Sequence, residues 1–215
     1  MKILSKTKAV KVLDLLAEAY PEAGCALDHH SLFELLVSVI LSAQTTDKSV
    51  NQVTPALFSA YPDAASLAAA DEEALHGILR RIGMYKTKAK NIKLMANMLM
   101  SEHNGETPRD FDALVKLPGV GRKTANVVLA VGFGEQRIPV DTHVFRLANR
   151  IGLCDEKDVL ETEKALMKRL PHDRWTEAHH SLIYHGRNCC FARKPNCENC
   201  VIREYCQSPA ASFNP

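Results

Sequence analysis

Apolar residues recur along almost the whole chain at the spacing of one face of an α-helix, and strand-like alternation is absent. With its capping and breaking residues, the pattern predicts helices near residues 6–19, 31–43, 46–60, 71–81, 86–103, 110–117, 121–133, 141–152, 157–170 and 174–188. Connections with proline or glycine separate several of them, at residues 61–63, 103–105 and 170–172. We therefore expect an all-α fold of packed helices.

Composition places these helices in a water-soluble protein. A chain of 215 residues with 46% hydrophobic content can bury a core as one large or two small domains. No apolar run approaches membrane-spanning length, and the lysine-rich N-terminus lacks the apolar stretch of a signal peptide. We expect a cytoplasmic location and no membrane partner.

The net charge of +2 is too small to indicate nucleic-acid binding, but the charges are unevenly distributed. Every charged residue from Leu79 to Lys93 is basic. Such a stretch can be an ordinary solvated helix face. Three basic segments coincide with turns, near Gly83, near Gly121 and at Arg193–Lys194, and this coincidence favours contact with phosphate.

A glycine turn reading LPGVG precedes the helix predicted from residue 121, and it places Arg122 and Lys123 in that helix's first turn. Cations are unfavourable at the positive end of a helix unless an anion binds there. Backbone amides around Gly119 and Gly121 can reach a phosphate because no side chain intervenes. The alternative is an ordinary helix-turn-helix corner.

Asp141 lies 18 residues after Lys123 and directly before another predicted helix. Its simplest role is an N-cap whose side chain accepts a backbone hydrogen bond. The same position would keep the carboxylate ionised, and an ionised carboxylate can stabilise positive charge that develops on a substrate. An amine nucleophile with a carboxylate partner is therefore a second interpretation of the pair, and His143 is expected to be structural.

Seven cysteines fall into two groups. Cys25 and Cys154 are isolated and are expected to be core residues. The other five lie within 18 residues near the C-terminus: Cys189, Cys190, Cys197, Cys200 and Cys206. Such a cluster indicates a metal site in a cytosolic protein. Zinc usually takes two tight pairs and only one is present, whereas iron–sulfur clusters tolerate varied spacing, so the spacing favours iron–sulfur modestly and leaves Cys189 and Cys190 as competing ligands.

These motifs together resemble the bacterial endonuclease III family, the iron–sulfur DNA glycosylases and AP lyases of base excision repair. The resemblance extends over the segments LPGVGRKTANVV (117–128), VDTH (140–143), HGRNCCFARKPNCENCVIREYC (185–206), ELLVSVILSAQTTD (34–47) and GMYKTKAKNI (83–92). It implies a two-domain helix-hairpin-helix glycosylase fold. A six-helix barrel domain would span residues 25–135, and a discontinuous cluster domain would combine residues 1–24 and 136–215. The implied protein is a nucleoid-associated monomer that holds a 4Fe-4S cluster and acts on double-stranded DNA containing oxidised pyrimidines or abasic sites.

The resemblance also assigns roles to individual residues. Lys123 matches the catalytic lysine and Asp141 the catalytic aspartate. Gln44 matches the residue that fills the space of a flipped base, and Met84 matches a wedge position that is often leucine. The remaining assignments are the DNA contacts Gly119, Gly121, Arg122, Arg193 and Lys194, and the cluster ligands Cys190, Cys197, Cys200 and Cys206. Solvent exposure is the alternative for Arg193 and Lys194.

The implied chemistry uses one amine twice. Lys123 would attack C1′ of the flipped nucleotide as the base departs, and the resulting Schiff base would promote elimination of the 3′ phosphate. Burial of the amine and the positive end of the helix would both favour its neutral form. Two rivals remain: an adenine-mismatch glycosylase, which lacks the hairpin lysine and carries glutamate where Ser38 stands, and a non-catalytic DNA-binding protein with structural zinc.

Overall fold

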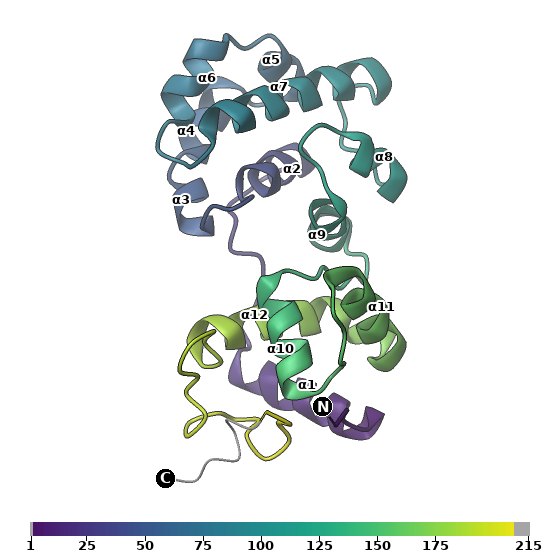
Figure 1. The fold of residues 1–215 in the computed structure, drawn as a ribbon. Helices are drawn as coiled ribbons and strands as arrows, with labels where there is room; N and C mark the ends of the chain where they lie inside the picture. The colour runs from purple at the N-terminus through teal and green to yellow at the C-terminus, as the bar shows by residue number, and fades with distance from the viewer. Residues whose placement is uncertain (1, 209–215) are drawn as a thin grey trace. The chain divides into compact units, whose positions relative to one another are not determined.

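The structure is a computed structural model in which residues 2–208 are described, and those residues form helices and connecting loops without strands (Figure 1). The chain divides into two compact units. The central unit is Ala26–Gly134; the terminal unit combines the described residues up to Cys25 with those from Glu135 onward. Within the described part, no helix is long and apolar enough to cross a membrane.

The central unit contains helices α2 to α9. Their bounds are α2 Leu32–Leu41, α3 Asp47–Asn51, α4 Thr54–Ala60, α5 Ala64–Ala68, α6 Glu72–Leu79, α7 Tyr85–Glu102, α8 Phe111–Lys116 and α9 Arg122–Phe133. Helix α2 is apolar on nearly every side and is almost entirely buried, as expected for a central core helix. It packs against α7 and α9. At Gly132 a Cβ atom would lie 2.7 Å from Leu32 Cδ2, so glycine permits the close approach of α9 to α2.

The terminal unit contains α1 Lys6–Ala19, α10 Thr142–Ile151, α11 Val159–Arg169, the short 3₁₀ helix η1 His172–Arg174 and α12 Trp175–Asn188. Helix α12 packs against α1 and α10, and α10 also packs against α11. Their shared core is aliphatic and includes Leu16, Leu147 and Leu182, each fully buried. The loops that carry the clustered cysteines follow α12 and reach this core through Ile202.

The helix expected at residues 46–60 is two helices, α3 and α4, and that prediction was wrong. Pro55 lies in the first turn of α4, where its missing N–H costs nothing; inside a continuous helix it would remove a hydrogen bond and clash with the preceding turn. Helix α5 was missed because five residues are too few to show periodicity, although Asp63 and Ser66 form a capping box at its start.

The two isolated cysteines differ. Cys154 is a core residue as expected, 1% exposed, and burial raises the pKa of its thiol to about 11. Cys25 is only partly buried, so the prediction that it is a core residue was wrong.

Candidate DNA and iron–sulfur sites

The connection between α8 and α9 is the glycine turn singled out in the sequence. Gly119 has φ of +82°, and a Cβ there would lie 3.0 Å from Ile40 Cγ2 and 3.1 Å from Asn91 Cβ. This position therefore requires glycine for structural reasons. Gly121, the N-cap of α9, has an ordinary φ of −95° and no atom within 4 Å of an added Cβ. The fold does not require a glycine at Gly121.

Several groups in this turn are suited to an anion. Both glycines are exposed, and within residues 2–208 their amides have no protein acceptor. Arg122 and Lys123 occupy the first turn of α9, as expected. The Arg122 guanidinium lies 5.2 Å from the centre of the Phe111 ring, which holds it beside the turn. The turn thus combines donors, cations and the positive end of a helix.

The Lys123 side chain is exposed. The burial that the sequence interpretation expected for this amine is therefore not present, and that expectation was wrong. Exposure leaves the amine accessible to a large substrate.

Gln44 and Met84 share an unusual backbone conformation. Gln44 has φ of +52° and Met84 has φ of +56°, which places both non-glycine residues in the left-handed region. Both side chains are exposed, and Met84 retains 51% of its accessible surface at the start of α7. Left-handed non-glycine residues are often found at functional sites, where surrounding contacts offset the strain. Lys194 also belongs to this class, with φ of +51°, and both it and Arg193 are exposed.

Asp141 is the N-cap of α10, and its Oδ1 accepts a hydrogen bond of 2.8 Å from the Val144 amide. Within the described residues this is the only hydrogen bond to the carboxylate, so Oδ2 has no protein donor. Burial lowers the pKa of His143, against the opposing effect of Asp141. Asp141 therefore caps α10 through Oδ1, as expected, and its Oδ2 remains available for another partner.

All five clustered cysteines line one hollow, with about 340 Å³ of space outside protein atoms, open solvent included. His185 and Arg150 also line it. The Arg150 guanidinium lies 3.4 Å from Cys190 Sγ and donates to the carbonyls of Phe191 and Ala192. A cation beside a thiolate stabilises its negative charge.

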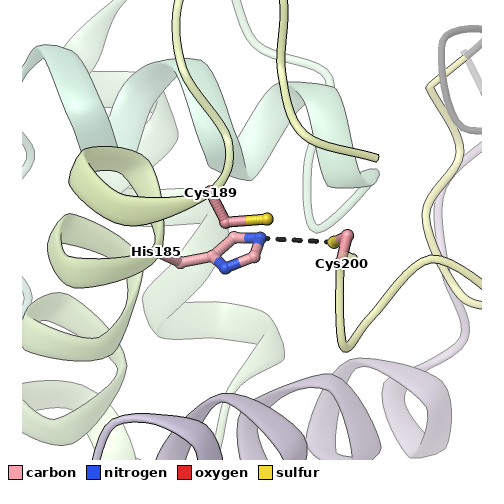
Figure 2. A group of neighbouring side chains, drawn as sticks. All are labelled: His185, Cys189 and Cys200. Atoms are coloured by element: carbon pink, nitrogen blue, oxygen red, sulfur yellow. Dashed lines mark hydrogen bonds between the residues drawn. The ribbon is translucent and has the colours of Figure 1, made fainter. Parts of the chain in front are cut away.

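The side chains that lie closest together in this hollow are His185, Cys189 and Cys200, whose ligand atoms are all within 4.8 Å of one another (Figure 2). His185 Nε2 lies 3.5 Å from Cys200 Sγ, and Nδ1 lies 3.0 Å from the Tyr20 hydroxyl. Burial lowers the pKa of His185 to about 4, so the ring is neutral near pH 7. If Tyr20 donates to Nδ1, Nε2 carries the hydrogen and donates to Cys200.

Only Cys200 of this close group belongs to the ligand set expected from the sequence. Ligand atoms this close together are typical of a site for a single metal ion. In an iron–sulfur cluster the thiolates bind separate iron atoms, so the ligands lie farther apart. Burial raises the pKa of Cys200 to about 12 and also raises the pKa of Cys189 and Cys206. Coordination to iron would hold such thiols as thiolates. The five thiols that line the hollow, with a cation beside them, are enough to supply the four ligands of an iron–sulfur cluster.

Sequence reasoning missed three residues. Arg150 and His185 contact the clustered cysteines, and the Lys88 amine donates to Thr45 Oγ1, next to Gln44. The contacts of Arg150 with Cys190 and of His185 with Cys200 join residues 40 and 15 positions apart. Lys88 was grouped with the basic residues of 79–93, yet it is 3% exposed. No local signal separates it from its exposed neighbours.

Together, the α8–α9 turn and the cysteine-lined hollow define an all-helical DNA-binding protein of the helix-hairpin-helix class with a thiolate metal centre. Comparison with known proteins gives a narrower answer. Residues 37–172 match the model of the HhH-GPD superfamily of base excision DNA repair proteins, and residues 190–206 match the iron–sulfur binding domain of endonuclease III. The second match begins at Cys190 and ends at Cys206.

Curated relatives agree with these models. The chain is 48% identical to endonuclease III of Bacillus subtilis (strain 168), covering 91% of this chain and 90% of the relative. It is 45% identical to endonuclease III of Escherichia coli (strain K12), covering 95% and 97%. A solved trapped endonuclease III–DNA covalent intermediate has a TM-score of 0.93 at 45% identity, covering 99% of this chain and 100% of that one.

The chain belongs to the endonuclease III family. It is a base excision repair enzyme, a DNA glycosylase with AP lyase activity, and its cofactor is a 4Fe-4S cluster.

Proposed function

We propose that this enzyme acts, as a monomer, on double-stranded DNA that contains oxidised pyrimidines or abasic sites, with Lys123 as its nucleophile. The observation that carries the proposal is the α8–α9 turn. The exposed Lys123 lies two residues after Gly121, and the amides of the exposed glycines Gly119 and Gly121 are available to phosphate. Binding of DNA phosphate beside the first turn of α9 would hold a nucleotide near the amine.

Lys123 then carries two steps. Its amine attacks C1′ of the flipped nucleotide and displaces the damaged base, and opening of the sugar ring gives a Schiff base. The imine acidifies the C2′ proton, so elimination of the 3′ phosphate breaks the strand. At an abasic site no base is displaced: the amine condenses with the C1′ aldehyde and releases water to give the same Schiff base, and elimination follows. One amine therefore serves both substrates.

Asp141 supplies the carboxylate in this proposal. Its Oδ1 caps α10 and is fixed by the Val144 amide, whereas Oδ2 has no protein donor within residues 2–208. A fixed, ionised carboxylate stabilises the positive charge that develops on the sugar as the base departs. The hydrogen bond that caps α10 would fix the orientation of the Asp141 carboxylate before DNA binds.

The remaining DNA contacts follow from exposure and backbone conformation. Gln44 would fill the space of the flipped nucleotide, and Met84 would insert between bases as an apolar wedge. Gly119, Gly121 and Arg122 would hold phosphate at the turn. Arg193 and Lys194 would hold phosphate from the cysteine loop, in the terminal unit.

The cluster ligands in this proposal are Cys190, Cys197, Cys200 and Cys206. The match of residues 190–206 to the iron–sulfur domain, with a cysteine at each end, supports this set over one that includes Cys189. When bound, the cluster would cross-link the loops of residues 189–206. The six-helix barrel domain in this proposal is residues 25–135, and the cluster domain is residues 1–24 with 136–215. Each boundary lies one residue from that of the compact units.

Trapping with borohydride tests the nucleophile. Wild-type protein should form a covalent complex with duplexes containing thymine glycol or an abasic site, because borohydride reduces the Schiff base. Lys123→Ala should form none, whereas Lys116→Ala, which removes an exposed lysine from the neighbouring helix α8, should trap normally. Equal trapping by Lys123→Ala would reject the assignment. Trapping of abasic DNA alone, without release of thymine glycol, would reject the lesion class.

A further inference from the structure

Three residues at and near the start of α7 each belong to, or contact, a different element of the proposed DNA site. Met84 caps the helix, Lys88 lies one turn later, and Asn91 lies about two turns along. The spacing of Lys88 and Asn91 places both on one side of α7, and Met84 directly precedes the helix. Met84 is the proposed wedge, Lys88 contacts the turn that carries Gln44, and Asn91 packs against Gly119 at the α8–α9 turn.

Lys88 is the unusual residue of these three. Its side chain is 3% exposed, and its amine donates to Thr45 Oγ1. Within the described residues this is its only hydrogen-bond partner, and no carboxylate pairs with it. Burial lowers the pKa of the amine. A buried cation without an anion costs stability, so an apolar side chain would serve the core better.

The turn that Lys88 contacts is itself strained. Gln44 adopts a left-handed conformation at φ of +52°. The Thr45 amide donates to the Ser42 carbonyl at 3.0 Å, which closes the turn after α2. Strain of this kind persists only where neighbouring contacts fix the conformation. The Lys88 amine supplies such a contact at the residue that follows Gln44.

We propose that Lys88 is a positioning residue that ties the Gln44 turn to α7, so that Gln44 and Met84 enter the duplex at a fixed spacing. This inference rests on the proposed roles of Gln44 and Met84. Lys88 itself does not touch DNA in this account; it acts through Thr45. The buried charge is retained because a hydrogen bond from an ammonium group holds the turn more firmly than apolar packing would.

Two variants remove the link from opposite ends. Lys88→Met deletes the amine and keeps the length of the side chain, and Thr45→Val deletes the hydroxyl while keeping the charge. Lys93→Met is the matched control, because Lys93 lies on the same helix and its amine donates to the Ala70 carbonyl, away from the Gln44 turn. Thr45→Ser keeps the hydroxyl that Thr45→Val removes, so it should behave like the wild type.

The readout is 2-aminopurine placed opposite a non-cleavable abasic analogue, whose fluorescence rises when the opposite base leaves the stack. Excision of thymine glycol is measured in parallel. Lys88→Met and Thr45→Val should each lose the fluorescence rise, as Gln44→Ala should. Both should slow excision roughly tenfold, as expected for loss of one charge-assisted hydrogen bond. The double variant should be no worse than either single one. The thermal midpoint of Lys88→Met should not fall.

The outcomes separate the two proposals. If Gln44→Ala loses the fluorescence rise while Lys88→Met and Thr45→Val keep it, the positioning role is overturned and the role of Gln44 stands. If Gln44→Ala keeps the rise, the proposed role of Gln44 fails and this inference fails with it. If Lys93→Met loses as much as Lys88→Met, the effect is one of charge and the positioning role is overturned.

Discussion

Two glycines in the α8–α9 turn should respond in opposite ways to the same change. Replacing Gly119 with alanine forces a side chain into the left-handed region at φ of +82°, which costs about 1–2 kcal/mol. The new methyl group would lie 3.0 Å from Ile40 Cγ2 and 3.1 Å from Asn91 Cβ, and overpacking of this kind costs about 1–3 kcal/mol. Together these costs should lower the free energy of unfolding by about 2–5 kcal/mol.

Gly121→Ala should be nearly neutral for the fold. Its φ of −95° suits alanine, and an added Cβ meets no atom within 4 Å. The change costs only the preference for glycine over alanine at an N-cap, about 1 kcal/mol or less. DNA binding should instead weaken roughly tenfold, equally for damaged and undamaged duplexes, because the methyl group would separate the backbone from phosphate.

Thermal unfolding and fluorescence-anisotropy titration measure the two effects. Gly119→Ala should lower the midpoint of unfolding by about 4–20 °C, and Gly121→Ala by only a few degrees. If Gly121→Ala binds DNA like the wild type, the proposed phosphate contact is wrong. If Gly119→Ala is as stable as the wild type, the packing against Ile40 and Asn91 does not constrain the turn as described.

Three further outcomes are expected. Asp141→Asn keeps a side chain that can cap α10, so the midpoint of thermal unfolding should be unchanged while excision slows roughly a hundredfold or more. If Asp141→Asn stays active, Asp141 acts only as a helix cap. Cys190→Ser should lose iron and the visible absorbance of the cluster, whereas Cys189→Ser should keep both, and the reverse pattern would exchange the two ligands. Alkylation at pH 8 should spare Cys154 until the protein unfolds, because its thiol is buried and its raised pKa of about 11 keeps the thiolate scarce; labelling in the native state would contradict that burial.

Local signals explain which features were predictable from the sequence. The start of α9 and the cap at Asp141 follow from rules that act over a few residues, and both positions agree with the structure. The break between α3 and α4 had a local signal in Pro55, which apolar periodicity hid.

The contacts of Lys88 and His185 were not predictable in this way. Lys88 meets Thr45 across 43 positions, and His185 meets Cys200 across 15. Such contacts depend on how helices and loops pack, and neither composition nor spacing encodes that packing. For the same reason the spacing could not decide whether Cys189 or Cys190 is the ligand. Two adjacent cysteines have the same sequence pattern, and only the folded chain determines which way each side chain points.

The most direct test of the central claim is peptide mapping of the borohydride-trapped complex by mass spectrometry. After nuclease and protease digestion, the reduced sugar adduct should lie on Lys123 and on no other lysine. An adduct on any other amine, or trapping that persists in Lys123→Ala at the wild-type level, would contradict the account.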